Sequence, residues 1–240
     1  MPAAVVLGAR NLGGAILDRL VADGFRAAGV AQSDDTLAAI EARGAFALRA
    51  DVTEPDQLAA ALERAAEELG GLDLIVNAVS VAAPAAGEPW GGGPLADADL
   101  AAFGRWTAHV AQLGFVFLSE GAQALRRVGG GTLVQVTNLA SRRASAGTGL
   151  WAAGHHAIRA LTHAAAQELR EDGIHACLLV VAAPIDSPKN AARRAAEGIA
   201  DDAAVDQAGI ANAVAFLAAQ GPRAVTYELE VTASGQRWAL

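Results

Sequence analysis

The chain has 240 residues, of which 53% are hydrophobic and 18% charged, and its formal net charge is -8. This length suits one α/β domain, and the composition excludes a mostly disordered chain. A net negative charge gives no electrostatic footprint for nucleic acid, so no nucleic-acid partner is expected.

The cysteine content and the N-terminus bear on the compartment. The single cysteine, Cys177, cannot form an intramolecular disulfide, and no cluster of Cys and His has the spacing of a structural zinc site, so no metal is expected. The N-terminus passes into a short apolar run without a basic leader, and no apolar segment approaches the ~18 to 20 residues that cross a bilayer. These features predict a cytoplasmic protein with no membrane partner.

Strand-like and helix-like segments alternate along the chain. Short apolar runs predict strands at 3–8, 25–31, 45–51, 72–78, 131–137, 176–182 and 228–232. Ala-, Leu-, Glu- and Arg-rich segments between them predict crossover helices at 14–23, 34–43, 55–69, 97–126 and 151–171. This alternation predicts one α/β domain over residues 1–240, with a doubly wound parallel sheet of about seven strands. Its ligand crevice should lie at the carboxyl ends of the strands.

The first predicted strand ends in LGARNLGGAI, a glycine-bearing turn that opens into a helix. Free N–H groups and the helix dipole at such a start can hold a pyrophosphate, and a Cβ would block close approach of the backbone. The position of this turn after the first strand of a βαβ series strengthens the prediction. Arg10, within the turn, could meet a phosphate or could simply be solvated.

The end of the second predicted strand bears on the choice of cofactor. An acidic residue there would accept hydrogen bonds from a ribose 2′-OH, and a basic residue would favour a 2′-phosphate. Ala31, Gln32 and Ser33 offer neither, and Asp34 and Asp35 are typical of a helix start. Both NADP and NAD therefore stay open, with NADP favoured.

Several segments fall in the order and spacing of the short-chain dehydrogenase/reductase family, which the chain resembles over nearly its whole length. They are the glycine turn, ADVT at 50–53, DLIVNA at 73–78, GLWAAGHHAIRALT at 149–162 and PIDSP at 184–188. The resemblance implies a Rossmann-like fold and NAD(P)-dependent oxidoreductase chemistry. Gly8 matches the first glycine of the family's phosphate turn and Gly14 the last, while Leu12 occupies the place of the middle one and Gly13 is an extra glycine.

The resemblance implies further cofactor-binding residues. Asp51, with Val52 beside it, resembles the aspartate that orders the adenine end of the cofactor, and Asn77 resembles the first Asn of the family's NNAG motif. A structural alternative stays open for two of them: Asp51 could cap a loop or helix, and Asn77 could tie neighbouring strands together.

The family's catalytic Asn, Ser, Tyr and Lys positions are occupied here by Ala111, Asn138, Trp151 and His155. An indole N–H only donates, so Trp151 can hold an oxygen but cannot complete general acid/base transfer. His155 lacks the permanent charge of a lysine, and a histidine in an Ala-rich helix is expected at a surface or an interface. Ordinary tyrosine-dependent hydride transfer is therefore not expected.

Three functions stay open from the sequence. The leading hypothesis is a degenerate family member that keeps the scaffold and binds a nucleotide or another small molecule. The second is a noncanonical NAD(P)-dependent oxidoreductase for a carbonyl or alcohol, with His155 or a water as proton carrier and Trp151 or Asn138 holding the substrate. The third is a non-enzymatic interaction subunit whose crevice is closed by Leu12.

Two long helices and two irregular segments complete the predictions. Helices 97–126 and 151–171 are Ala-rich, and the resemblance implies that they build a homodimer or homotetramer, or pair with an active relative; burial in the core is the alternative. Trp90, in the Gly- and Pro-rich loop 84–94, could form a lid or pack over an edge. Segment 186–206 is expected to be largely helical and to close over the substrate.

Overall fold

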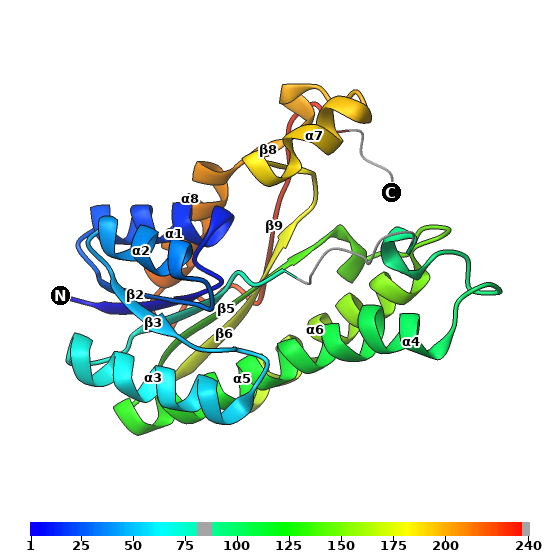
Figure 1. Ribbon diagram of the computed structural model, residues 1–240. Coiled ribbons are helices and arrows are strands. Elements are labelled where there is room, and N and C mark those ends of the chain that lie inside the picture. The colour runs from blue at the N-terminus through cyan, green and yellow to red at the C-terminus, as the bar shows by residue number, and fades with distance from the viewer. Residues whose placement is uncertain (81–87, 237–240) are drawn as a thin grey trace.

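A parallel sheet of seven strands, in the order β3-β2-β1-β4-β5-β6-β9, forms the centre of the computed structural model (Figure 1). The structure describes residues 1–80 and 88–236, so residues 84–87 of the predicted loop lie outside the described ranges. The strands are β1 (Ala3–Leu7), β2 (Arg26–Ala31), β3 (Phe46–Arg49), β4 (Leu74–Asn77), β5 (Gly131–Asn138), β6 (Ile174–Val181) and β9 (Glu228–Val231). Every neighbouring pair is parallel, which confirms the predicted Rossmann-like fold.

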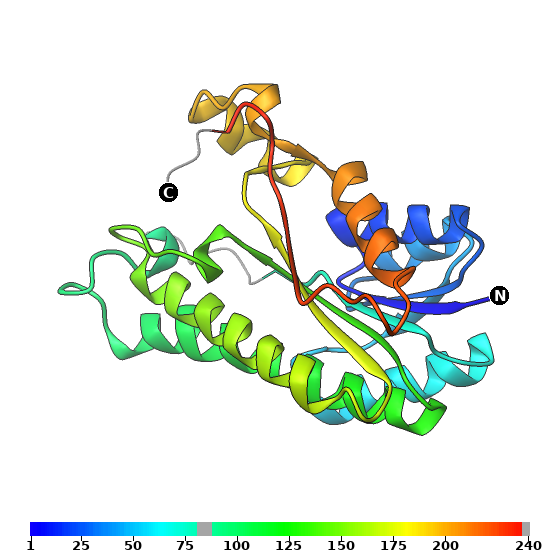
Figure 2. The same cartoon turned by 180° about the vertical axis from the view of Figure 1, so that it is seen from behind.

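Helices cover both faces of this sheet, which explains why its central strands read as continuous apolar runs. They are α1 (Asn11–Ala22), α2 (Asp34–Ala42), α3 (Pro55–Leu69), α4 (Leu100–Phe103), α5 (His109–Val128), α6 (Gly149–Glu168), α7 (Pro188–Ala196) and α8 (Gln207–Ala218). Helices α3, α5 and α6 lie on one face, and α1, α2 and α8 lie on the other (Figures 1 and 2). The strand order reverses between β1 and β4, so the crevice that binds ligands in such sheets lies at their carboxyl ends.

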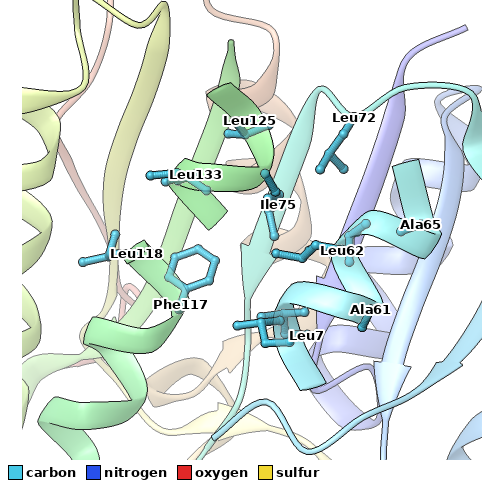
Figure 3. Close-up of a cluster of buried hydrophobic side chains, with 14 of the residues drawn as sticks. Leu7, Ala61, Leu62, Ala65, Leu72, Ile75, Phe117, Leu118, Leu125 and Leu133 are labelled. Carbon is cyan, nitrogen blue, oxygen red and sulfur yellow. The ribbon is translucent and has the colours of Figure 1, made fainter. Parts of the chain in front are cut away.

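The core on the α3 and α5 side holds the strand ends in place. Leu62 of α3 and Phe117 of α5 lie over Leu7 and Ile75 of the sheet, as Figure 3 shows. All four side chains are at most 1% exposed. Burial of each such side chain contributes about 1.5 to 3 kcal/mol, so this layer holds α3 and α5 against the sheet.

Helix α8 was not among the predicted helices, and the structure departs from the predicted elements in two further places. The helix expected at 97–126 is a run of α4, a π-helical turn η2 (Gly104–Ala108) and α5, which ends where Gly129 adopts a φ of +92°. The segment 186–206 contains α7 and a short 3-10 helix η4 (Asp201–Ala203), but it also forms a two-stranded sheet of β7 (Ile185–Asp186) and β8 (Val205–Asp206). Two-residue strands are too short to leave a pattern in the sequence.

Candidate functional site

The glycine turn after β1 is held by two close backbone approaches. Gly8 has a φ of +75°, and a Cβ built on it would lie 3.0 Å from the backbone N and Cα of Val79. A Cβ on Gly13 would lie only 2.4 Å from the carbonyl oxygen of Gly8. Gly13, which is an extra glycine relative to the family's phosphate turn, therefore has the least room in the turn. A Cβ on Gly14 would lie 3.1 Å from the guanidinium of Arg43, a flexible neighbour.

The start of α1 is built to hold an anion. Its N-cap residue, Arg10, makes no side-chain capping bond, and the first turn carries no acidic residue. The first N–H groups of a helix have no acceptor within the helix, and the dipole places partial positive charge there. Arg10 is exposed and, with Asn11, lines one end of a groove of about 670 Å³ between α1 and α8. These residues fit the pyrophosphate of a dinucleotide.

Leu12 does not project into open solvent at this turn. Its side chain is 9% exposed and belongs to the core cluster that includes Val6 and Ile16. Leu12 therefore packs in the core. Its position does not support the hypothesis of an interaction subunit whose crevice is closed by Leu12.

Asp51 and Asn77 both carry structural hydrogen bonds. Asp51 accepts from the backbone N–H of Thr53 at 3.0 Å and from its hydroxyl at 2.7 Å, and these bonds lower the pKa of Asp51. Asn77 is 1% exposed and donates to Gln135 of β5 at 3.0 Å, while its Oδ1 accepts from the N–H of Val79 at 3.2 Å. Val52 is buried in the core beside α3. Asp51 therefore caps the loop after β3, and Asn77 ties β4 to β5, which are the structural alternatives considered for these two residues.

His155 is buried, with 6% of its surface exposed, so the expectation that it lies at a surface or an interface is wrong. Its Nδ1 lies 2.9 Å from Oγ1 of Thr137, and its Nε2 lies 3.1 Å from Nδ2 of Asn138. Ala140 donates its N–H to Oδ1 of Asn138 at 2.9 Å, so the amide presents its NH₂ group to the imidazole. The hydrogen-bond network therefore assigns the proton of the neutral ring to Nδ1, which donates to Thr137.

The protonation state of His155 follows from the same surroundings. Burial lowers the pKa of His155 to about 4, and the neighbouring charge of His156 acts in the same direction. The ring is therefore neutral at pH 7, and both of its nitrogens are engaged by Thr137 and Asn138. A histidine in this state is a poor proton carrier.

Three tryptophans gather beside His155. Trp90 of the 3-10 helix η1 (Trp90–Gly92) lies 5.0 Å from Trp106 of η2 and 5.3 Å from Trp151 of α6, measured between ring centroids. Trp106 and Trp151 are 5.5 Å apart, and Trp151 meets the ring of His155 at 4.1 Å. We call Trp90, Trp106 and Trp151 the tryptophan cluster. No spacing in the sequence links these positions.

Exposure within the tryptophan cluster runs from the core to the surface. Trp106 is fully buried and donates its indole N–H to Glu88 at 2.9 Å, whereas Trp90 is 45% exposed. Trp90 therefore packs against its neighbours and also presents part of its ring outward. The cluster adjoins the end of β5 because Trp151 contacts His155, which contacts Asn138.

Two further residues lie apart from this cluster or offer no reactive group: Ala111, at the family Asn position, and Tyr227, the single tyrosine of the chain. Ala111 lies in the first turn of α5 and has no polar side chain. Tyr227 directly precedes β9, at the amino end of that strand, whereas Asn138 stands at the carboxyl end of β5. In a parallel sheet these are opposite edges, so Tyr227 cannot replace the family tyrosine.

The sequence did not reveal an ion-pair network centred on Glu228 of β9. This carboxylate lies 2.8 Å from Arg159 and 2.8 Å from His163, both on α6, and 3.5 Å from Arg142. Burial would raise the pKa of Glu228, but the hydrogen bond and charge of Arg159, with the charges of His163 and Arg142, lower it. The network ties α6 and the segment after β5 to the edge strand of the sheet.

Two absences concern only the part of the chain that the structure describes. Over residues 1–80 and 88–236, no helix is long and apolar enough to cross a membrane. Within the same ranges, no group of three or more His, Cys, Asp or Glu side chains is arranged to hold a metal ion.

The chain is similar to known proteins in sequence and in fold. The family model described as Enoyl-(Acyl carrier protein) reductase matches residues 6–235. A cis-4-hydroxycyclohexanecarboxylate dehydrogenase of Sinomonas cyclohexanicum is 32% identical over 180 residues, which are 71% of this chain and 68% of that protein. A short-chain type dehydrogenase/reductase from Mycobacterium ulcerans has a TM-score of 0.84 at 20% identity and covers 95% of this chain and 87% of its own. A blue fluorescent protein from a metagenomic library, in complex with NADPH, has a TM-score of 0.76 at 29% identity, with 97% and 96% covered.

Proposed function

The chain belongs to the short-chain dehydrogenase/reductase family, and from that premise we propose that it binds a nicotinamide dinucleotide without carrying out tyrosine-dependent hydride transfer. It is then a degenerate member of an oxidoreductase family. The observation that carries this proposal is the bonding of His155, which leaves neither ring nitrogen free for a proton at the end of β5.

Dinucleotide binding is supported by the start of α1. Gly8 and Gly13 keep the turn close to the sheet, and the uncapped N–H groups from Asn11 onward would hold the pyrophosphate. The family resemblance assigns the adenine end to Asp51 and Val52. Two similar solved structures contain NADPH or NADP. When bound, the nicotinamide supplies a site that gives or accepts a hydride.

The proposal favours NADP over NAD. Ala31, Gln32 and Ser33 follow one another at the end of β2, and none of them is an acid that would select a free ribose 2′-OH. Arg10 is exposed at the nearby start of α1 and can meet a phosphate. Asp34, by contrast, is ion-paired with Arg49 on the following strand.

Hydride transfer is lost because neither Trp151 nor His155 can transfer the proton that the reaction also requires. Interconversion of an alcohol and a carbonyl moves a proton at the substrate oxygen as well as a hydride at carbon. The indole of Trp151 donates a hydrogen bond but does not exchange its proton usefully near neutral pH. The imidazole of His155 is neutral, with a pKa of about 4, and is hydrogen-bonded at both nitrogens.

Titration with NADPH and NADH, followed by nicotinamide fluorescence and calorimetry, tests cofactor binding. We expect micromolar binding of NADPH, and Arg10→Ala should weaken NADPH binding more than NADH binding. Arg127→Ala, at the far end of α5, is the matched control and should leave both unchanged. No binding of either cofactor up to millimolar concentration would reject the proposal and leave an interaction subunit.

Restoring the family residues tests the missing chemistry separately. The triple variant Asn138→Ser, Trp151→Tyr and His155→Lys should gain NADPH-dependent reduction of small ketones, while the unmodified protein stays inactive. The double variant that keeps Trp151 is the control, and it should gain nothing because it still lacks the proton donor. Turnover by the unmodified protein would contradict the degenerate assignment.

A second candidate function is oxidation of a ring alcohol with a water as proton carrier. It is favoured by the dehydrogenase of Sinomonas cyclohexanicum, whose printed name gives cis-4-hydroxycyclohexanecarboxylate as its substrate. Incubation with this hydroxy acid and NADP⁺ or NAD⁺ should then yield the reduced cofactor. Activity lost in His155→Ala but kept in Trp151→Phe would indicate His155, rather than water, as the proton carrier.

We also propose that the protein forms a homodimer, or a tetramer, through α5 and α6. Phe115 of α5 is 56% exposed, which suits a residue of an interface. The glycines of these helices serve packing within the chain, because a Cβ on Gly114 would lie 2.7 Å from Ile158. Light scattering should report a dimer or tetramer for the unmodified protein and a smaller species for Phe115→Glu, whereas a monomer in both would reject the proposal.

A further inference from the structure

The tryptophan cluster stands at the end of the crevice expected to receive the nicotinamide half of a dinucleotide. In a doubly wound sheet, the ribose of one nucleotide is read at the end of β2, so the other half lies across the switch point, over β4 and β5. Asn138 ends β5, and His155 and Trp151 adjoin it in turn. The chemical character of this end is therefore set by His155 and the tryptophans.

Three side chains at this end that could carry positive charge, His155, Arg105 and Arg142, are neutral or ion-paired. His155 is neutral because burial keeps its pKa far below 7. Arg105 is ion-paired with Glu88, which also accepts from Trp106. Arg142, after β5, is ion-paired with Glu228 and Glu230. A cation that arrives here therefore meets no unpaired charge from His155, Arg105 or Arg142.

Indole rings favour a cation over a neutral ring of the same shape. The negative face of a tryptophan attracts cations within about 6 Å of its centroid, and tryptophan does so better than tyrosine or phenylalanine. The oxidised nicotinamide ring carries a formal positive charge, and the reduced dihydropyridine ring carries none. Trp90 is 45% exposed and Trp151 is partly exposed, so both rings have surface that a ligand bound beside the end of β5 can contact.

We propose that the protein binds NADP⁺ more tightly than NADPH, and that Trp90 and Trp151 cause this preference. The proposal rests on the proposed function, because it requires that the dinucleotide binds. The preference is about 3- to 30-fold in dissociation constant, the equilibrium equivalent of one cation–π contact. A protein with this preference and without turnover reports the oxidised cofactor rather than consuming it.

Calorimetry on the full chain with NADP⁺, NADPH, NAD⁺ and NADH tests the inference. Each oxidised form should bind more tightly than its reduced partner. Equal affinities, or tighter binding of the reduced forms, would overturn the inference while leaving the proposed function intact. Failure of all four dinucleotides to bind would reject both.

Substitutions of Trp90 test whether its indole ring causes the preference for the oxidised cofactor. Trp90→Leu should reduce the preference, and Trp90→Phe should keep part of it, because a phenyl ring has a weaker negative face. Phe216→Leu is the control, since Phe216 is 54% exposed near the far end of α8 and should not change the ratio. An unchanged ratio in Trp90→Leu and in Trp151→Leu, with both variants folded by circular dichroism, would refute the role of the cluster.

Discussion

One imidazole joins α6 to the end of β5: Nδ1 of His155 lies 2.9 Å from the hydroxyl of Thr137, and its Nε2 lies 3.1 Å from the amide nitrogen of Asn138. The ring therefore serves as a neutral cross-link between a helix and a strand. Because Trp151 lies one helical turn before His155 and packs on its ring at 4.1 Å, this cross-link also sets the position of the indole.

His155 should make stability depend on pH. Folding lowers its pKa from 6.5 to about 4, so the unfolded chain binds the proton more readily. Its contribution to stability is complete above about pH 6.5 and is lost as the pH falls toward 4, by on the order of 3 kcal/mol. Urea unfolding between pH 8 and 4 should show this fall, and His155→Gln should flatten it. His156→Gln, at the exposed neighbouring position, should keep most of the slope, because burial is the larger cause of the lowered pKa of His155.

Gly13→Ala should be strongly destabilising. Its Cβ would lie 2.4 Å from the carbonyl oxygen of Gly8, and a backbone atom cannot move aside as a flexible side chain can. We expect a loss of about 3 kcal/mol in the free energy of unfolding, with loss of cofactor binding. In Gly104→Ala nothing lies within 4 Å of the new Cβ, so stability should stay the same or rise by up to about 1 kcal/mol. Equal effects in chemical denaturation would show that the turn can relax.

Glu228→Gln should loosen the edge of the sheet. The carboxylate is 17% exposed and faces Arg159, His163 and Arg142, so its removal leaves those groups without their shared anion. The expected loss is about 1 to 3 kcal/mol at pH 7. Because folding lowers its pKa, this stabilisation is present above about pH 4.5 and is lost as the pH falls below that value. The exposed Glu171→Gln should change the unfolding midpoint little, and a difference that vanishes at low salt would contradict the ion-pair explanation.

Trp106 and Trp90 should differ in their contribution to stability. Trp106 is fully buried and hydrogen-bonded to Glu88, so Trp106→Ala should cost about 3 to 5 kcal/mol. Trp90 is 45% exposed and loses fewer contacts, so Trp90→Ala should cost about 1 kcal/mol. Thermal unfolding of the two variants measures this order. If Trp90→Ala were the more damaging, Trp90 would be a structural anchor rather than an accessible face of the crevice.

The alternation of apolar strands with helices was enough to predict the sheet. The strand Ala3–Leu7 is apolar along its whole length, and Leu74–Asn77 is apolar up to its final Asn77, because helices cover both faces. Periodicity and glycine turns are local properties of the chain, and the helix at Pro55–Leu69 was predicted to its last residue. The glycine turn after the first strand was placed for the same reason.

Only the tertiary structure decided the character of the site. Trp90, Trp106 and Trp151 come from three separate elements, and no pattern in the sequence brings them together. The burial of His155, and with it a pKa of about 4, depends on how α6 packs against β5. The need for glycine at position 13 arises from the approach of two backbone segments. The sequence specifies the residue types, but the dielectric surroundings of a side chain and the contacts between distant segments exist only once the chain has folded.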